Sequence, residues 1–167
     1  DILPEISLYT MFKGIDAPVL LKNIENFLSE HQLNCRNITI NITQDMLNTM
    51  SHRELVNFSS AIHSFGFKLG LFGFGLEYIN IKCFSEKLFD SVSFSASFIS
   101  GIIDGYYPNK LLKFVFDYFT SSGVSIILPY NLSSAIIETV KKFGCNKFAY
   151  HSSKLLNLDA FRMEREL

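Results

Sequence analysis

The chain has 167 residues, of which 48% are hydrophobic and 19% are charged, with 17 Phe and no Trp. Its length is that of an ordinary single domain, and so apolar a composition excludes a disordered chain and predicts one packed core. The formal net charge is −1, and Lys and Arg form no basic stretch. These features argue against a nucleic acid as a direct ligand, because nothing in the chain would attract a polyanion.

The three cysteines, Cys35, Cys83 and Cys145, are far apart. An odd number without CxxC or Cys/His spacing is typical neither of a disulfide framework nor of a zinc site, so we expect free thiols. No apolar run reaches the roughly 18 to 20 residues of a membrane helix, and the acidic start with Asp1 and Glu5 is unlike a signal peptide. We therefore expect a cytoplasmic protein that neither enters nor crosses a membrane.

Short β-rich runs recur along the chain and alternate with segments of helical period. We count six or seven such runs, and the order of strand and helix predicts parallel strands joined by crossover helices. The clearest runs cover residues 6–9, 38–42, 68–72, 90–94, 124–128 and 147–150.

Helical segments lie between these runs. Pro18 marks a helix start, and Ser51 with Glu54 three residues later forms a capping box for a second helix, which we expect to end near Gly66. Further helices are predicted at about residues 109–120, after the run at 124–128, and around 158–166. The apolar stripe of the first helix consists of Val19, Leu20, Ile24, Phe27 and Leu28, and that of the 109–120 helix of Leu112, Val115 and Phe119.

This α/β pattern fits two architectures, an open doubly wound sheet or part of a TIM-type (β/α)₈ barrel. Periodicity does not choose between them. Both architectures place a ligand site at the carboxyl ends of the strands. Those ends are nearly free of acidic residues in this chain.

Five segments of the chain carry a resemblance to the EAL family of cyclic di-GMP phosphodiesterases. Residues 65–75, FGFKLGLFGFG, resemble the family's GxRLALDDFGTG, in which a strand presents two aspartates to metal ions. Residues 123–145 match GxxVVAEGVE…LLRELGC without a gap. Residues 40–44 resemble LELTE, residues 93–99 resemble KIDRSFV, and residues 148–155 stand where VQGYLFSRPL would be. The similarity begins near Ile6, after the family's first strand, so residues 1–167 resemble a single, N-terminally shortened EAL domain.

The resemblance implies a modified TIM barrel whose family chemistry is metal-assisted phosphodiester hydrolysis, with carboxylates holding two Mg²⁺ or Mn²⁺ ions. In this chain Asn41 replaces the glutamate of the third strand and Phe72 and Gly73 replace the paired aspartates. Ser93 stands for the lysine that assists the attacking water. The altered positions are Asn41, Gln44, Phe72, Gly73, Ser93, Ser95, Pro129 and Ala149.

These replacements predict a domain that holds no metal or other cofactor and is not an enzyme. Hard divalent cations require oxygen ligands, and the amide of Asn41 alone does not make a dinuclear site. Charge is removed consistently, so no buried lysine is left without its partner, and we expect Phe72 to pack in the core.

Some degenerate EAL-like proteins act by binding other proteins, including the master transcription regulator of flagella. The resemblance therefore implies a regulator whose partner is another cytoplasmic protein, such as a transcription regulator of motility or virulence genes, or a second copy of the chain. Phe116 lies off the stripe of the 109–120 helix and is expected to be exposed. The candidate contact residues are Tyr106, Tyr107, Lys110, Lys113 and Phe116. The alternative is that these rings seal the outer layer of the barrel.

Two other functions remain open at this point. A non-catalytic receptor for cyclic di-GMP would need purine and phosphate contacts, but Arg and Lys are missing from the predicted strand ends and Ala149 has replaced the nucleotide-contacting glutamine. An unrelated enzyme could use Asn41, Thr43 and His151, although no nucleophile and base form a pair. Both alternatives are weaker than protein binding.

Overall fold

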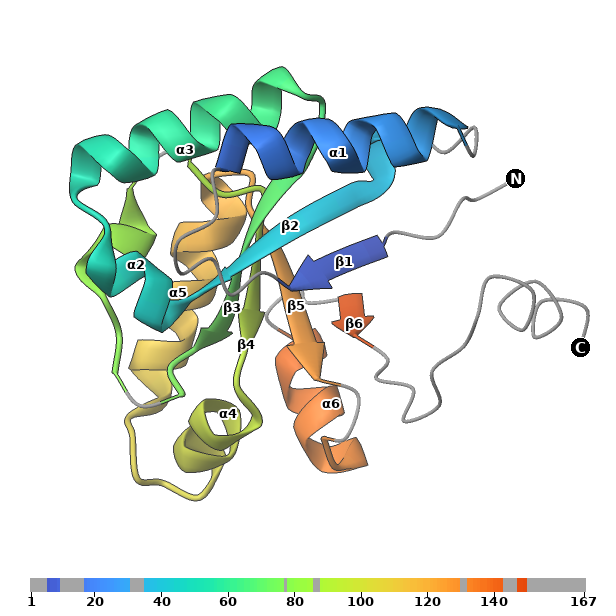
Figure 1. Ribbon diagram of the computed structural model, residues 1–167. Helices are drawn as coiled ribbons and strands as arrows, with labels where there is room; N and C mark the ends of the chain where they lie inside the picture. Colours follow the sequence, from blue (N-terminus) through green and yellow to red (C-terminus); the bar gives the residue numbers. More distant parts are fainter. Residues whose placement is uncertain are drawn as a thin grey trace, which may run out of the picture.

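Six parallel strands alternate with helices in the computed structural model, which describes residues 6–9, 17–30, 35–76, 78–85, 88–129, 132–142 and 147–149 (Figure 1). The strands are β1 (Ile6–Tyr9), β2 (Ile38–Thr43), β3 (Lys68–Phe74), β4 (Ser91–Phe94), β5 (Ser125–Pro129) and β6 (Lys147–Ala149). The helices are α1 (Ala17–Glu30), η1 (Cys35–Asn37), α2 (Gln44–Thr49), α3 (His52–Ser64), η2 (Ile81–Phe84), α4 (Ala96–Ile103), α5 (Asn109–Ser121) and α6 (Ser134–Lys141).

The order of strands in the sheet decides between the two architectures left open by the sequence. The strands pair in chain order, from β1 to β6, and every pairing is parallel. A doubly wound sheet reverses its strand order at a switch point, whereas a barrel adds each strand next to the previous one. The chain therefore forms part of a TIM-type barrel.

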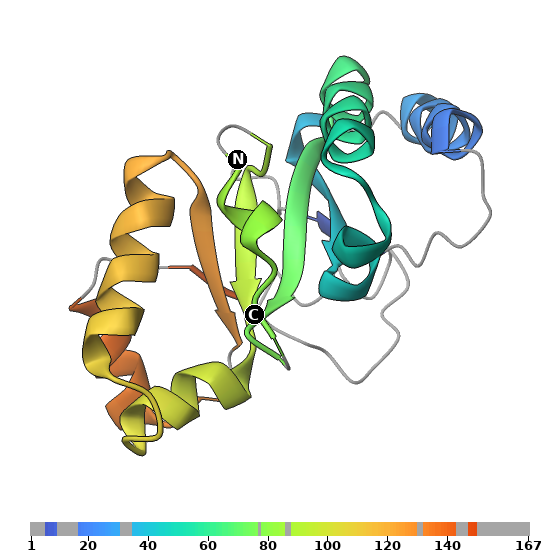
Figure 2. The ribbon, with the colours of Figure 1, turned by 90° about the vertical axis from the view of Figure 1, so that its left-hand side faces the viewer.

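The two faces of the sheet carry different residues. On one face the strands present large aliphatic side chains, such as Ile40, Leu69 and Val92, and these are buried under the helices. α3 contacts β3 and α5 contacts β5, and Figure 2 shows α5 and α3 to either side of η2. The opposite, inner face carries mostly small or polar residues, together with Phe72 and Ile127, in two rows that follow the strand register. One row contains Asn41, Gly70, Ser91 and Ser125, and the next contains Thr43, Phe72, Ser93 and Ile127.

A β-bulge at Gly73 interrupts β3 near its end. Phe72 pairs with Ser93, but the next pair is Phe74 with Phe94, so Gly73 is the extra residue. Its φ of +77° lies in the left-handed region that favours glycine. Because side chains alternate along a strand, the extra residue moves Phe74 from the inner face to the helix-covered face.

Phe74 is the centre of a cluster of aromatic rings under the helices. Its ring centroid lies 4.8 Å from that of Phe94 and 5.5 Å from those of Phe98 and Phe119. These separations are typical of favourable aromatic pairs, and several of the contacts are edge-to-face. Much of the chain's high Phe content is thus used in one core between β3, β4, α4 and α5.

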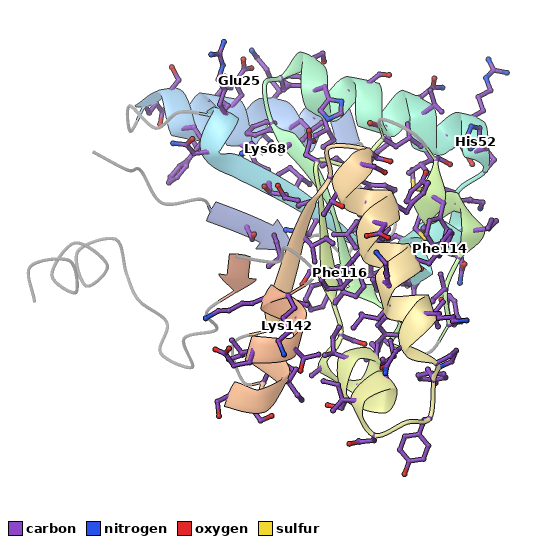
Figure 3. The ribbon with its side chains drawn as sticks, turned by 180° about the vertical axis from the view of Figure 1, so that it is seen from behind. Glu25, His52, Lys68, Phe114, Phe116 and Lys142 are labelled. Atoms are coloured by element: carbon purple, nitrogen blue, oxygen red, sulfur yellow. The ribbon has the colours of Figure 1, made fainter. Side chains whose placement is uncertain are left out.

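The prediction that Phe116 is exposed is wrong. Phe116 is 0% exposed, and its ring centroid lies 5.3 Å from that of Phe94. Leu112, Val115 and Phe119 are buried as expected, and Phe116 extends this stripe because positions i+3 and i+4 lie on the same side of a helix. Phe114 points outward instead and is 59% exposed; Figure 3 labels both phenylalanines on α5.

The capping box before α3 is confirmed. The Ser51 hydroxyl accepts from the Glu54 amide at 3.2 Å, and the Ser51 amide donates to the Glu54 carboxylate at 2.7 Å. These bonds to Ser51 lower the pKa of the Glu54 carboxyl.

Other expectations need correction. In α1, Leu21 and Leu28 are buried, but Val19 and Phe27 are exposed, so the apolar face is rotated from the predicted stripe. β4 begins at Ser91, one residue later than expected, and the carboxylate of the preceding Asp90 accepts from the Leu69 amide at 2.8 Å. The expectation of free thiols is confirmed for Cys35 and Cys83, and burial raises the pKa of the Cys83 thiol to about 12. The predicted helix at 158–166 lies outside the described residues, as does Cys145.

Gly75 and Gly123 form a matched pair for testing the packing of this core. Both have a φ of +76°. A Cβ added at Gly75 would lie 2.6 Å from the ring of Phe98, whereas a Cβ added at Gly123 would have no other atom within 4 Å. We expect Gly123→Ala to lower the free energy of unfolding by roughly 1 kcal/mol, because of its backbone conformation alone. Gly75→Ala should lower it by about 2–4 kcal/mol, because the buried ring of Phe98 must also move. Urea unfolding of both variants measures the difference, and equal losses would contradict the close packing of Phe98 on Gly75.

Candidate functional site

The carboxyl ends of the strands are covered by short helices. α2, α4 and α6 follow β2, β4 and β5 within a few residues and lie at the end of the sheet to which the strand arrows point (Figure 1). Sequence reasoning missed α2 and α4, although each begins after a capping hydroxyl. Thr43 Oγ1 accepts from the Met46 amide at 3.3 Å, and Ser95 Oγ accepts from the Phe98 amide at 3.1 Å. Thr43 and Ser95 therefore cap helices.

The structure brings most of the predicted site positions together on the inner face. Asn41, Ser93 and Ser95 are buried, and the Asn41 amide donates to the Thr39 carbonyl at 3.4 Å. A Cβ at Gly70 would lie 2.2 Å from Asn41 Oδ1, so glycine at this position lets Asn41 lie across β3. Pro129 and Ala149 are register partners at the ends of β5 and β6. His151 lies outside the described residues.

Phe72 was expected in the core and is instead 39% exposed. The strand register before the bulge explains the difference. Phe72 stays on the inner face in register with Thr43 and Ser93, and Phe74 takes the core position.

The side chains at these positions do not fit a dinuclear metal centre. Asn41 offers a neutral amide oxygen and the two serines offer neutral hydroxyls, while Phe72 and Gly73 offer no side-chain oxygen. Mg²⁺ and Mn²⁺ bind strongly only where carboxylates supply negative oxygens. Among the described residues, no group of three or more His, Cys, Asp or Glu side chains is placed to hold a metal ion.

A pocket of about 140 Å³ opens beside these positions, and we call it the strand-end pocket. It is lined by Thr43, Gln44, Asp45, Phe72, Gly73, Leu76 and Tyr78. Its wall combines one carboxylate with two aromatic rings and a leucine. Neither Lys nor Arg occurs among these residues, so the pocket favours a ligand that is partly apolar and either neutral or positively charged.

The loop after β3 forms one wall of the strand-end pocket and is held on α2 by side-chain hydrogen bonds. The Tyr78 hydroxyl donates to Asp45 Oδ1 at 2.7 Å, and Asn48 bonds in turn to the Tyr78 hydroxyl. The Lys82 ammonium donates to the carbonyl of Leu47 at 3.2 Å. These contacts fix the position of Asp45 at the pocket.

Gln44 is the unusual polar residue of the strand-end pocket. The residue is 7% exposed, and neither its Nε2 nor its Oε1 has a hydrogen-bond partner among the described residues. A buried amide without partners costs about 1–3 kcal/mol of stability, and such a cost is common where a ligand later supplies the partners.

The second group of candidate residues lies between α4 and α5. Tyr106 is 80% exposed, and Lys110 and Lys113 are exposed as well, with Lys113 paired to Asp117 at 2.7 Å. Tyr107 is half-exposed because one side of its ring packs over Gly101 and Phe98. We call the exposed residues here, Ile103, Tyr106, Tyr107, Lys110, Lys113 and Phe114, the α4–α5 surface.

The EAL domain family model matches residues 6–149. The chain belongs to the EAL domain family. This assignment confirms the resemblance seen in the sequence, and the consecutive parallel strands agree with it. No helix in the described part of the chain is long and apolar enough to span a membrane.

Solved EAL structures share the fold at low sequence identity. A standalone versatile EAL protein from Vibrio cholerae O395, in its c-di-GMP-bound form, is 15% identical with a TM-score of 0.75, and the match covers 88% of this chain and 62% of that one. The EAL domain of Mycobacterium smegmatis DcpA is 14% identical with a TM-score of 0.69, over 86% and 63% of the two chains. The chain thus spans less than two thirds of these structures. No curated protein sequence matches it significantly.

Replacing Gln44 tests whether its amide lacks partners. Gln44→Leu keeps the approximate size of the side chain and removes both unpaired polar atoms, so we expect the free energy of unfolding to rise by about 1–2 kcal/mol. Asn41→Leu is the matched control, because the Asn41 amide is hydrogen-bonded and its loss should lower stability. Urea unfolding measures both. A loss of stability in Gln44→Leu would mean that the Gln44 amide has partners in solution.

Proposed function

We propose that this EAL domain is a non-catalytic regulator that acts by binding another protein. The observation that carries this proposal is the set of residues at the strand ends. Where the family's chemistry uses carboxylates and a lysine, this chain has Asn41, Phe72, the bulged Gly73 and Ser93. Without anionic oxygens the domain has no means of holding the two metal ions that polarise the phosphodiester and activate water.

The strand-end pocket also argues against a cyclic dinucleotide as the ligand. Small-molecule sites usually have volumes of about 300–1,000 Å³. The pocket measures about 140 Å³ and has a carboxylate in its wall, which would repel phosphates. Several structural relatives do carry cyclic di-GMP, among them the Vibrio cholerae protein and the Bacillus subtilis YkuI protein. A non-catalytic receptor for this nucleotide is therefore the second candidate.

The α4–α5 surface is the proposed contact region for a protein partner. Tyrosine is enriched at protein interfaces because its ring buries apolar area while its hydroxyl remains hydrated. Tyr106 is 80% exposed and Phe114 is 59% exposed, and Lys110 adds a positive charge nearby. A transcription regulator of motility or virulence genes is the partner class that the family resemblance suggests, and a second copy of the chain is the other.

Titration calorimetry with cyclic di-GMP separates the two candidate functions. We expect no binding heat up to about 1 mM nucleotide, where the free energy of binding would be only about −4 kcal/mol. Adding Mg²⁺ should change nothing, because the strand ends lack the carboxylates that would bind it. Micromolar affinity would contradict protein binding as the main function and favour the receptor.

Two exposed aromatic residues test the contact region. Replacing both Tyr106 and Phe114 by Ala should weaken binding to the protein partner at least about tenfold, because central aromatic residues supply much of the binding energy of an interface. Phe27→Ala is the matched control, since Phe27 is a partly exposed aromatic residue on the distant helix α1. Binding is measured by biolayer interferometry with purified partner. Equal affinity of the double variant and the wild type would remove the α4–α5 surface from the proposal.

A further inference from the structure

We propose that the strand-end pocket receives an arginine side chain of the partner protein. This inference rests on the proposed function and names a second contact, separate from the α4–α5 surface. It follows from three properties of the pocket, namely its charge, its unpaired acceptor and its aromatic walls.

The charge comes from Asp45, the acidic residue among those that line the pocket. Asp45 is exposed, and its Oδ1 accepts from the Tyr78 hydroxyl at 2.7 Å. Within the described part of the chain its Oδ2 makes no hydrogen bond, and no Lys or Arg there forms an ion pair with it. The carboxylate is therefore held in position, and one of its oxygens is available to a positively charged ligand.

The unpaired acceptor is Gln44 Oε1, on the residue that precedes Asp45. The side chain is more than nine-tenths buried and lines the same pocket. A guanidinium carries five N–H donors in a planar fork, so it can donate to Asp45 and, when the covered amide of Gln44 turns toward the pocket, to Gln44 Oε1 as well. The Gln44 Nε2 atom can then donate to a main-chain carbonyl of the bound segment. Both unpartnered atoms of Gln44 would be satisfied by one arginine residue.

The walls favour arginine over lysine. The Phe72 and Tyr78 rings line the pocket together with Leu76. A guanidinium stacks on aromatic faces and is weakly hydrated, whereas the ammonium of lysine is strongly hydrated and presents no flat face. The hydrogen bonds that hold Tyr78 on α2 fix this wall before binding, which reduces the entropy lost when a ligand binds.

The volume agrees with a single side chain. An engineered cavity of about 150 Å³ accommodates one benzene molecule. The strand-end pocket, at about 140 Å³, is of the same size and therefore fits one planar group with its attached methylenes.

The test uses a capped amino acid as the probe. The ¹⁵N-labelled full chain is titrated with Nα-acetyl-L-arginine amide, and backbone amide shifts are followed by NMR. We expect shifts at Gln44, Asp45 and Gly73, with a dissociation constant in the range of about 1–10 mM, as for a single side chain. Nα-acetyl-L-citrulline amide has nearly the same shape without the charge, and it should bind at least about tenfold more weakly.

A matched pair of variants tests the role of the carboxylate. Asp45→Asn should weaken arginine binding at least about tenfold while the rest of the amide spectrum remains that of the wild type. Glu30→Gln changes the net charge equally at the far end of α1 and should leave the affinity unchanged (Figure 1). The assignment is overturned if the arginine probe causes no shifts, or if Asp45→Asn binds arginine normally. It is also overturned if the citrulline probe, or Nα-acetyl-L-lysine amide titrated in the same way, binds as tightly as the arginine probe.

The two proposals can fail separately. If arginine does not bind but the Tyr106 and Phe114 double variant still loses its partner, protein binding stands and the pocket assignment is wrong. If cyclic di-GMP binds tightly and the arginine probe binds at Asp45 as well, the proposed function is wrong and the pocket assignment stands.

Discussion

The β-bulge at Gly73 is the constraint on which both the core and the candidate site depend. A single extra residue reverses the alternation of side chains at the end of β3. Phe74 enters the aromatic core beneath α4 and α5, and Phe72 remains on the inner face beside the strand-end pocket. Glycine permits this at low cost, because the bulge requires a positive φ. The loop that starts at Gly75 is then directed across α2, where Asp45 and Asn48 bind its Tyr78 hydroxyl.

Asn41, Phe72, Gly73 and Ser93 carry no charge at the positions where the family resemblance implies carboxylates and a lysine, and there is an energetic reason for such a neutral set. A lysine left among neutral residues in a buried site costs several kcal/mol, so its loss together with the aspartates avoids an unpaired buried charge. The hydroxyls that remain have structural tasks. Thr43 and Ser95 cap α2 and α4, which close the ends of the strands. These two hydroxyls thus stabilise local structure at the strand ends.

Two surfaces remain available for recognition, and they differ in character. The α4–α5 surface presents exposed rings and lysines from the end of α4, the segment that follows it and the first half of α5. The strand-end pocket is concave and acidic and contains the unpartnered amide of Gln44. A barrel supplies the rigidity that both need, because its parallel strands and covering helices bury the backbone hydrogen bonds that hold the loops in place. Recognition by a preformed surface loses little conformational entropy on binding.

The positions of the strands and most helices could be predicted from the sequence, because alternation, helical period and capping boxes are local properties. The predicted runs at 6–9, 38–42 and 124–128 differ from β1, β2 and β5 by at most one residue at either end. The absence of carboxylates at the strand ends was also visible in the sequence, since residue identity alone decides whether a side chain can be an anionic metal ligand.

Tertiary structure decided what depends on contacts between distant segments. The consecutive strand order requires pairing across crossover helices, and the burial of Phe116 depends on Phe94, a residue of another element. The pocket joins Gln44 to Leu76 and Tyr78 through the fold of a loop, and no local pattern in the sequence encodes that contact.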